Sequence, residues 1–338
     1  MPLHIASFAM KTRLPLSLLE FQRIFPGEAE CIAYLEAIRW PDGFTCPICG
    51  ISDTAQRIAT RPRILRCRHC RRDISLTAGT VMHATRTSLQ AWFLGAYLMT
   101  TQTPGMSALQ LQRQLGLPRY ETAFQMLHKL RAGMVRPDRD RIGTSWPVEV
   151  DEALIGGRSR GEGRGVHHKE LVVGALEVRT RPADDKKKGE RALYAGRLRL
   201  CHIANRKTET LSGFVKGNVE KGAKVRTDGW GGYDHLATEG YMHKPMVFKG
   251  DPERMDAHLP MIHITFSNLK TWLQGTHHSV GKQHLQAYLD EFVFRYNRRF
   301  YPMTGFASIL GIGMGVSAPT YRELYDGTWD HHTRSAGS

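Results

Sequence analysis

The segment VEVDEALIGGRSRGEGRGVHHKE, residues 148–170, joins a short β-like run to a glycine-rich basic loop. β-branched and alternating content in its first residues is typical of a strand. Asp151 is a carboxylate within that run, and the loop behind it is flexible and positively charged. The loop holds five glycines and four basic residues: Gly156, Gly157, Gly161, Gly163, Gly165, Arg158, Arg160, Arg164 and Lys169. The role of Asp151 beside this loop depends on which other residues of the chain lie near it.

Three strands, a helix and a fourth strand are predicted in the second half of the chain. Alternating and β-branched residues predict strands within 146–157, 170–179 and 192–205. A helix within 207–219 then precedes a short strand that ends at Asp228 and is followed by glycines. This order is that of an RNase H-like core, an α/β fold with a mixed sheet in which the first and fourth strands lie side by side.

Asp151 and Asp228 would meet on neighbouring strands of such a sheet. Two adjacent carboxylates repel each other and are costly to desolvate unless cations lie between them. Carboxylate oxygens suit Mg2+, and two such ions about 4 Å apart stabilise the attacking and the leaving oxygen at a phosphodiester. The pattern therefore indicates that the aspartates hold magnesium. The loop would then approach a DNA backbone through Arg158, Arg160 and Arg164. In the alternative, both aspartates are ordinary surface turn residues.

A helical segment precedes this core. Residues 88–100 have the apolar spacing of a buried helix, and residues 105–134 predict two helices interrupted at Gly116 and Pro118. A short helix, a glycine-containing turn and a basic second helix are typical of a helix-turn-helix that enters the DNA major groove. Its candidate DNA contacts are Arg119 and Lys129. Two packed helices of an ordinary bundle would produce the same pattern.

Four of the six cysteines form two C-x2-C pairs in the N-terminal part of the chain. They are Cys46, Cys49, Cys67 and Cys70, with seventeen residues between the pairs. Two such knuckles complete a tetrahedron of thiolates around a structural Zn2+ and leave no coordination position open. The alternative is two unrelated pairs of reduced cysteines. Arginines surround the second knuckle, and Arg68 and Arg71 are candidate contacts to DNA phosphates.

The composition agrees with a DNA-binding protein of several domains. The chain has 338 residues, of which 41% are hydrophobic, and a formal net charge of +15. That charge favours a polyanionic partner, although a general solubility bias would also produce it. The longest apolar stretch, residues 91–99, is about half of the ~18 residues that a membrane span needs, and the N-terminus lacks a signal-peptide pattern. We expect a cytoplasmic protein without a membrane partner.

These patterns predict a multidomain α+β protein with four segments. An N-terminal helix and zinc ribbon occupy residues 1–84, and a helix-turn-helix-like helical DNA-binding segment occupies residues 85–137. The RNase H-like catalytic domain extends over residues 138–316, and a polar tail over residues 317–338.

Seven stretches of the chain resemble the bacterial ISXO-like insertion-sequence transposases. They are RWPDGFTCPICG, LTAGTVMHATRTSLQAWF, SALQLQRQLGLPRYETAFQMLHKLR, VEVDEALIGG, VRTDGWGGY, SNLKTWLQGTHHSV and HLQAYLDEFVFRYNRR, in family order from about Glu20 to Ile312. The resemblance implies a zinc-ribbon head, a DDE-type RNase H-like core, and transposition by strand cleavage and joining at element ends. It implies Asp151 and Asp228 as the first two ligands of Mg2+ or Mn2+. The implied partners are double-stranded DNA, at element ends and target, and further copies of the chain in a homo-oligomer on that DNA. The implied location is the bacterial cytoplasm, at the nucleoid.

The third acidic position of the family differs in this chain. Many members carry glutamate seven residues before a lysine or arginine; here Lys270 matches the lysine, and His263 is the residue seven before it. Other members carry asparagine, which Asn268 matches. A neutral amide oxygen suits magnesium better than an imidazole nitrogen, so we rank Asn268 first as a ligand. His263 would then contact the scissile phosphate, and Lys270 would hold a phosphate nearby.

A predicted helix over residues 283–299 carries a further family pattern, a glutamate followed by arginines at four and seven residues. These are Glu291, Arg295 and Arg298, which share one helical face. Either Glu291 lends a carboxylate to the site and the arginines hold DNA phosphates, or the set is a helix salt bridge. Because the third acidic residue is missing, a second function remains open: a non-catalytic DNA-binding protein derived from a decayed transposase. A third is a different RNase H-like nuclease.

Overall fold

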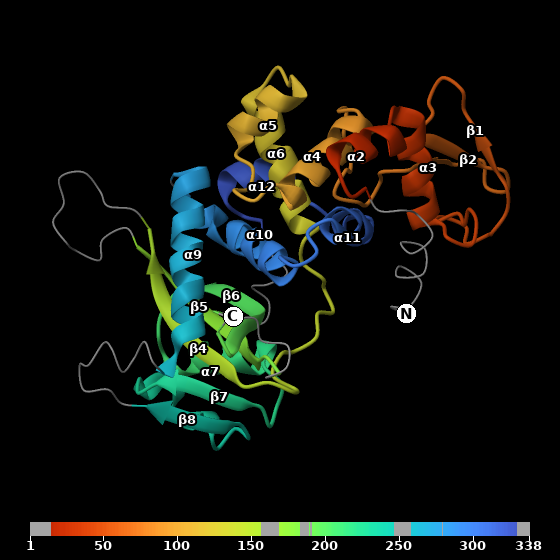
Figure 1. The fold of residues 1–338 in the computed structure, drawn as a ribbon. Helices are drawn as coiled ribbons and strands as arrows, with labels where there is room; N and C mark the ends of the chain where they lie inside the picture. The colour runs from red at the N-terminus through yellow and green to blue at the C-terminus, as the bar shows by residue number, and fades with distance from the viewer. Residues whose placement is uncertain are drawn as a thin grey trace. The chain divides into compact units, whose positions relative to one another are not determined.

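The computed structural model describes residues 15–156, 169–182, 189, 191–246, 258–278 and 280–329, which form two compact units (Figure 1). Within these residues, unit 1 comprises the chain up to Arg136 together with residues 298–329, and unit 2 comprises Pro137–Asn297. No helix in these ranges is both long and apolar enough to cross a membrane. Each unit has a core of its own and is described by itself.

Helices form most of unit 1. They are α2 (Leu18–Ile24), α3 (Glu28–Arg39), α4 (Leu89–Thr101), α5 (Ala108–Leu115), α6 (Tyr120–Ala132), α11 (Thr304–Gly313) and α12 (Tyr321–Asp326). Their shared core is aromatic. The rings of Phe21, Phe25 and Phe93 surround Phe306 of α11, each with its centroid 5.6 Å from that ring. Aromatic rings bury a large apolar area and prefer tilted or edge-to-face contacts at such distances, so these rings hold the helices together.

The last helices of the chain pack with the first ones. Although the expected catalytic domain runs to residue 316, the structure places residues 298–316 in unit 1. The physical reason is the apolar surface of α11, where Phe306, Ile309 and Leu310 are buried and the helix packs on α4. Part of the expected polar tail also folds, because Thr320 and Glu323 form a capping box that starts α12.

α5 and α6 are joined by the turn that the sequence predicts. Ser107 caps α5 by accepting the backbone N–H of Gln110, and Gly116 ends the helix with φ of +61°, a left-handed conformation that glycine adopts without strain. The second half of α6 is largely buried, whereas Arg119 and Tyr120 at its start are exposed. The two helices therefore match the helix-turn-helix pattern, and their contact with DNA stays a prediction.

The cysteine-containing segment adds a small antiparallel sheet to unit 1. Its strands are β1 (Ala55–Arg57), β2 (Ile64–Cys67) and β3 (Asp73–Ser75), in the order β1-β2-β3. The buried core beneath these strands consists of Cys46, Cys67 and Ile74, with Trp40 and Phe44 packed against it. So few apolar side chains stabilise a sheet weakly, which is the situation in which small domains use a structural metal.

Unit 2 is built on a five-stranded sheet with the strand order β6-β5-β4-β7-β8. Its strands are β4 (Val148–Ile155), β5 (Glu170–Thr180), β6 (Leu193–Ile203), β7 (Lys224–Asp228) and β8 (Met242–Met246). β5 is antiparallel to both β4 and β6, whereas β7 runs parallel to β4 and to β8. The four predicted strands are present and the first and fourth lie side by side. β8 is an addition that the sequence patterns did not predict.

Helices cover both faces of this sheet (Figure 1). One face carries α7 (Thr208–Asn218) and the 3-10 helix η2 (Gly231–Leu236). The other face carries α9 (Pro260–His277) and α10 (Leu285–Asn297), with the short 3-10 helix η3 (Lys282–His284) between them in the chain. Val148 and Val150 lie in the core on the α7 side, and Ile155 lies in the core formed with α9 and α10. Since side chains of a strand alternate between the faces, Asp151 points to the α9 side and Glu152 to the α7 side.

α10 also covers the outer edge of β6. Gln286 accepts the backbone N–H of His202 at 2.8 Å, and Asn297 accepts that of Leu198 at 2.8 Å while donating to the Leu198 carbonyl at 3.1 Å. An edge strand exposes a row of unpaired backbone groups, and these two amides satisfy part of it. The predicted helix over residues 283–299 is thereby fixed along the sheet.

Candidate active site and zinc centre

Asp151 and Asp228 lie side by side on neighbouring parallel strands. β4 and β7 pair in a register that sets Glu149 opposite Arg226, and continuing it by two residues sets Asp151 beside Asp228. Both aspartates are partly buried. Burial and the charge of Asp151 raise the pKa of Asp228, which is the effect expected when two carboxylates share a site. The structure therefore brings together the two carboxylates that the sequence singles out.

His263 reaches the same carboxylates from the first turn of α9. Its Nε2 lies 3.0 Å from Oδ2 of Asp151. The imidazole also lies within electrostatic reach of Asp228, where a protonated ring would favour the ionised carboxylate. Two carboxylates and one imidazole thus converge where β7 ends beside the middle of β4.

A buried glutamate, Glu149, holds the start of α9 against the sheet. Its Oε2 accepts the backbone N–H groups of Met261 and Ile262 at 2.9 and 2.8 Å. The first N–H groups of a helix have no partner inside it, and a carboxylate is a strong acceptor for them. Burial raises the pKa of Glu149 to about 7, against the opposing effect of these hydrogen bonds. Because Glu149 and Asp151 share a face of β4, this contact sets His263 next to Asp151.

On the other face of β4, Glu152 forms a second buried contact. The hydroxyl of Tyr233 donates to its Oε2 at 2.6 Å, and Nε of Arg206 lies 3.3 Å from its Oε1. Burial and the charges of Asp151 and Asp228 raise the pKa of Glu152 to about 7. Glu152 therefore ties η2 and the loop after β6 to the strand that carries Asp151.

Glu149, Glu152 and Arg206 are site residues that the sequence patterns did not indicate. One signal was present: two glutamates flank Asp151 inside a strand whose other residues are apolar. A buried carboxylate is costly unless it accepts hydrogen bonds or pairs with a cation. Acidic residues in such a strand therefore predict partners, although the sequence does not say which ones.

The other third-position candidates lie along α9. Asn268 is exposed, and because an α-helix turns about 100° per residue, it points about 140° away from His263. Lys270 is also exposed, but seven residues bring it back to within about 20° of the direction of His263. The structure thus brings His263 to Asp151, gives Lys270 the same helical side, and turns Asn268 elsewhere.

Glu291 is buried in α10, and Arg295 and Arg298 after it are partly exposed. Glu291 is fully buried in α10, and Nη1 of Arg295 lies 3.6 Å from its Oε1. The guanidinium of Arg295 also lies over the ring of Trp272, 5.9 Å from its centroid. Arg298 belongs to unit 1, where burial and the nearby Arg136 lower its pKa to about 10. The Glu291–Arg295 contact has the geometry of the helix salt bridge.

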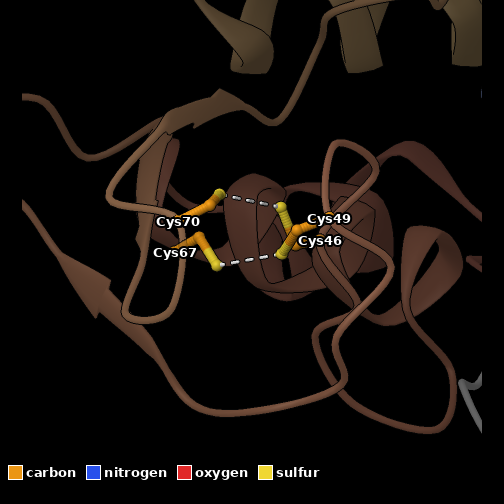
Figure 2. A group of neighbouring side chains, drawn as sticks. All are labelled: Cys46, Cys49, Cys67 and Cys70. Carbon is orange, nitrogen blue, oxygen red and sulfur yellow. Dashed lines mark hydrogen bonds between the residues drawn. The ribbon is translucent and has the colours of Figure 1, made fainter.

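The four cysteines of the two knuckles face one another (Figure 2). Sγ of Cys46 lies 3.7 Å from that of Cys70, and Sγ of Cys49 lies 3.8 Å from that of Cys67. All four sulfurs lie within 4.8 Å of one another. A regular tetrahedron with zinc–sulfur distances of ~2.3 Å has edges of ~3.8 Å. The spacing therefore fits four thiolates around one Zn2+, and the chemistry of four sulfurs favours zinc over hard cations.

The two knuckles close with the same turn. The N–H of Gly50 donates to the carbonyl of Cys46 at 2.9 Å, and the N–H of Arg71 donates to the carbonyl of Cys67 at 3.1 Å. Both turn residues have positive φ, +73° at Gly50 and +60° at Arg71. Glycine adopts this conformation freely, whereas a side chain is strained in it. Arg71 therefore occupies a position that the first knuckle assigns to glycine.

The arginines of the ribbon divide into two groups. Four of them pair with carboxylates of unit 1: Arg57 with Glu36, Arg63 with Glu28, and Arg61 and Arg66 with Asp73. Arg68, Arg71 and Arg72 are exposed around the second knuckle. Arginines of the first group shape the ribbon, and those of the second have guanidinium groups that face solvent.

The remaining predicted DNA contacts differ in their exposure to solvent. Arg119 is exposed where α6 begins. Lys129 instead donates to the backbone carbonyl of His83 at 3.2 Å, and burial lowers its pKa. Arg158, Arg160 and Arg164 lie outside the described residues.

Two family models match the chain, one in each unit. The model of the ISXO2-like transposase domain matches residues 144–297, the range that contains Asp151, Asp228 and His263. The model of the transposase zinc-ribbon domain matches residues 26–73, the range that contains the four clustered cysteines. No curated protein and no solved structure matches the chain. The two family matches confirm the expected resemblance to the ISXO-like insertion-sequence transposases and support a structural zinc ion in the ribbon.

Proposed function

We propose that this chain is an active transposase that cleaves and joins DNA strands with divalent metal ions at the ends of an insertion sequence. One observation carries the proposal: Asp151 and Asp228 lie beside each other on parallel strands, inside the range that matches the transposase domain. Adjacent carboxylates are costly in a folded protein unless they bind something positive. Such a pair, with the imidazole of His263 on one carboxylate, is therefore suited to bind metal.

The sheet of unit 2 supports an RNase H-like assignment. In the observed order β6-β5-β4-β7-β8, three antiparallel strands are followed by a fourth that runs parallel to the first. α7 connects the third strand to the fourth, as the predicted order requires. We propose that this unit is the DDE-type catalytic core.

Asp151 and Asp228 would hold Mg2+ or Mn2+ through carboxylate oxygens. When bound, such cations supply positive charge to the attacking and leaving oxygens of a phosphodiester. We place His263 ahead of Asn268 as the third side chain of the site, because His263 contacts Asp151 and Asn268 points elsewhere on α9. Lys270, on the same side of α9 as His263, is suited to hold a neighbouring phosphate.

Double-stranded DNA is the proposed partner. The net charge of +15 and the exposed arginines Arg68, Arg71 and Arg119 support it. In this proposal the ribbon and the start of α6 bind the element ends, and the chain acts as a homo-oligomer that pairs two ends. Zinc has a structural role only, because four thiolates leave no position for a reacting group.

The direct test is metal-dependent nicking of DNA that carries the inverted repeats flanking the gene. Wild-type protein should nick and join this DNA with Mg2+ or Mn2+ and should do neither in EDTA. Asp151→Ala and Asp228→Ala should each abolish nicking while DNA binding is unchanged or slightly tighter, because each removes a ligand and a negative charge. Nicking at the wild-type rate by either variant would contradict the assignment.

One observation favours a second function, a non-catalytic DNA-binding protein derived from a decayed transposase. The third position offers histidine or asparagine and no carboxylate, since no Asp or Glu lies between residues 258 and 289. In that case the wild-type protein should bind the repeats with the expected salt dependence and show no nicking with any divalent metal.

A further inference from the structure

Trp230 is an exposed aromatic side chain beside the aspartate pair. It follows Asp228 by two residues, and 48% of it is exposed. Its backbone N–H donates to Oδ1 of Asp228 at 3.1 Å. Single exposed apolar residues are common on protein surfaces and need no explanation by themselves. The surroundings of Trp230 distinguish it from such residues.

The indole ring is held in one place. Its Nε1–H donates to the backbone carbonyl of Arg206 at 3.3 Å, which links it to the loop after β6. Gly232 allows the ring to lie close to the backbone, because a Cβ on Gly232 would be 3.0 Å from Cδ1 of Trp230 and 2.8 Å from Cδ1 of Leu211. The polar atom of the ring is therefore satisfied and one edge is packed, so what remains open to solvent is apolar ring surface.

Positive charge lies next to this surface. Arg206 and Lys207 are exposed in the loop that accepts the indole hydrogen bond. Arg206 is also tied to Glu152, with Nε 3.3 Å from Oε1. Its guanidinium thus lies between a buried carboxylate and solvent, where a phosphate group would be attracted. Aromatic rings that stack with bases, beside basic side chains that attract the backbone, are the combination with which proteins bind single-stranded nucleic acid.

We propose that Trp230 is a stacking platform for an unpaired nucleobase adjacent to the phosphate at Asp151 and Asp228. Every base has a π face, so such a platform accepts any sequence, and stacking on an aromatic side chain contributes substantially to affinity. A base that leaves the duplex next to the scissile phosphate would give this phosphate access to the aspartates. This inference rests on the proposed function, because it takes DNA as the ligand of the site.

The test measures binding without cleavage. Full-length protein is titrated, with Ca2+ in place of Mg2+, into fluorescein-labelled duplexes that carry the element end. One duplex is fully paired, one has an unpaired base next to the scissile phosphate, and one has an abasic nucleotide in that place. The wild type should bind the unpaired-base duplex roughly tenfold more tightly than the paired or the abasic duplex.

Variants then assign this preference to the ring. Trp230→Ala should bind all three duplexes about equally, and Trp230→Phe should keep most of the preference because it keeps a stacking surface. Met242→Ala removes another exposed apolar side chain of the same unit and should behave as the wild type. The proposal is overturned if the wild type shows no preference, if Trp230→Ala retains it, or if the abasic duplex binds as tightly as the unpaired base.

The last outcome would mean that the site recognises an open backbone through its basic residues. If Trp230→Phe loses the preference for the unpaired base as Trp230→Ala does, the stacking role is also overturned. The preference would then depend on the indole Nε1–H, which already donates to the carbonyl of Arg206. Failure of the proposed function is seen separately: the wild type would then nick none of the three duplexes with Mg2+ or Mn2+.

Discussion

Oε2 of Glu149 accepts the backbone N–H of Ile262 at 2.8 Å, and this bond ties the strand that carries Asp151 to the helix that carries His263. Glu149 is two residues before Asp151, and Ile262 is one residue before His263. The same carboxylate oxygen also accepts the N–H of Met261. Because both backbone groups are buried, the position of His263 relative to Asp151 depends on one acidic side chain outside the predicted triad.

Glu149→Ala should therefore weaken both stability and nicking. It leaves two buried N–H groups without an acceptor, at a cost of about 3 kcal/mol, and it releases the first turn of α9. Glu149→Gln retains one oxygen acceptor and should lose much less of either. Urea unfolding and nicking rates check this together. Equal loss in the two variants would show that the charge of Glu149, rather than its acceptor oxygen, matters.

The stability of unit 2 should fall in acid through Glu177. Burial opposes the ionisation of this carboxyl, but hydrogen bonds from Arg197, Gly143 and Arg179 outweigh it, and its pKa is lowered to about 2. A carboxyl with a lowered pKa in the folded state contributes stability above its unfolded pKa of about 4.5, and loses it as pH falls toward 2. Glu177→Gln should be about 3 kcal/mol less stable than wild type at pH 7. This difference should shrink toward pH 3 in urea unfolding, and a constant difference would refute the linkage.

The ribbon should hold one zinc ion per chain. Cys49→Ser removes one of four thiolates and should abolish zinc retention, since metal binding supplies much of the folding free energy of such a small core. Limited proteolysis should then cleave within residues 46–70 while unit 2 stays protected. Cys201→Ser is the matched control, because Cys201 lies in β6 outside the cluster. Elemental analysis that finds equal zinc in both variants would contradict the assignment.

A substitution at Arg71 should change both the stability of the ribbon and its affinity for DNA, and the two effects can be measured separately. Replacing Arg71 by glycine removes the strain of its positive φ and should stabilise the zinc-bound ribbon by about 1 kcal/mol. The same change removes an exposed charge, so affinity for any DNA sequence should fall and the salt dependence should weaken by about one phosphate contact. Arg68→Ala should cause a similar loss of affinity without the gain in stability. Unchanged affinity in both variants, measured across a salt series, would mean that DNA does not contact this knuckle.

The sequence predicts the parts of unit 2 whose pattern is local and regular. β4 to β7 follow from alternation, and Asp151 and Asp228 follow from the parallel pairing of the first and fourth strands. β8 was missed because Met242–Met246 is an exposed edge strand with a proline, Pro245, and so has neither alternation nor a buried run. The membership of α11 in unit 1 was missed for another reason. Its apolar residues indicate a buried helix, but only the folded chain shows which core buries them.

Which side chain joins Asp151 and Asp228 as the third member of the site depends on the direction in which each residue of α9 points. The sequence pattern left this direction open. His263 and Asn268 lie on one helix, five residues apart, and only one of them can face Asp151. In the structure that residue is His263, with Nε2 3.0 Å from the carboxylate. The chemistry of ligand types ranks them in the opposite order, because an amide oxygen suits Mg2+ better than an imidazole nitrogen. We therefore give geometry more weight than ligand preference and propose His263, because Asn268 points about 140° away from it on the helix.

His263→Ala should therefore reduce nicking at least a hundredfold, and Asn268→Ala should leave it within about twofold of wild type. His263→Glu offers a carboxylate in the same place and should restore activity with Mg2+, the hard cation that prefers oxygen. The wild type should use Mn2+ better than Mg2+, because nitrogen ligands suit transition-metal ions. Nicking of paired-end DNA in each metal measures all three variants. If Asn268→Ala is inactive and His263→Ala is active, the amide is the ligand and the helix must turn when metal binds. If both are active and Glu291→Gln is not, the third carboxylate comes from α10.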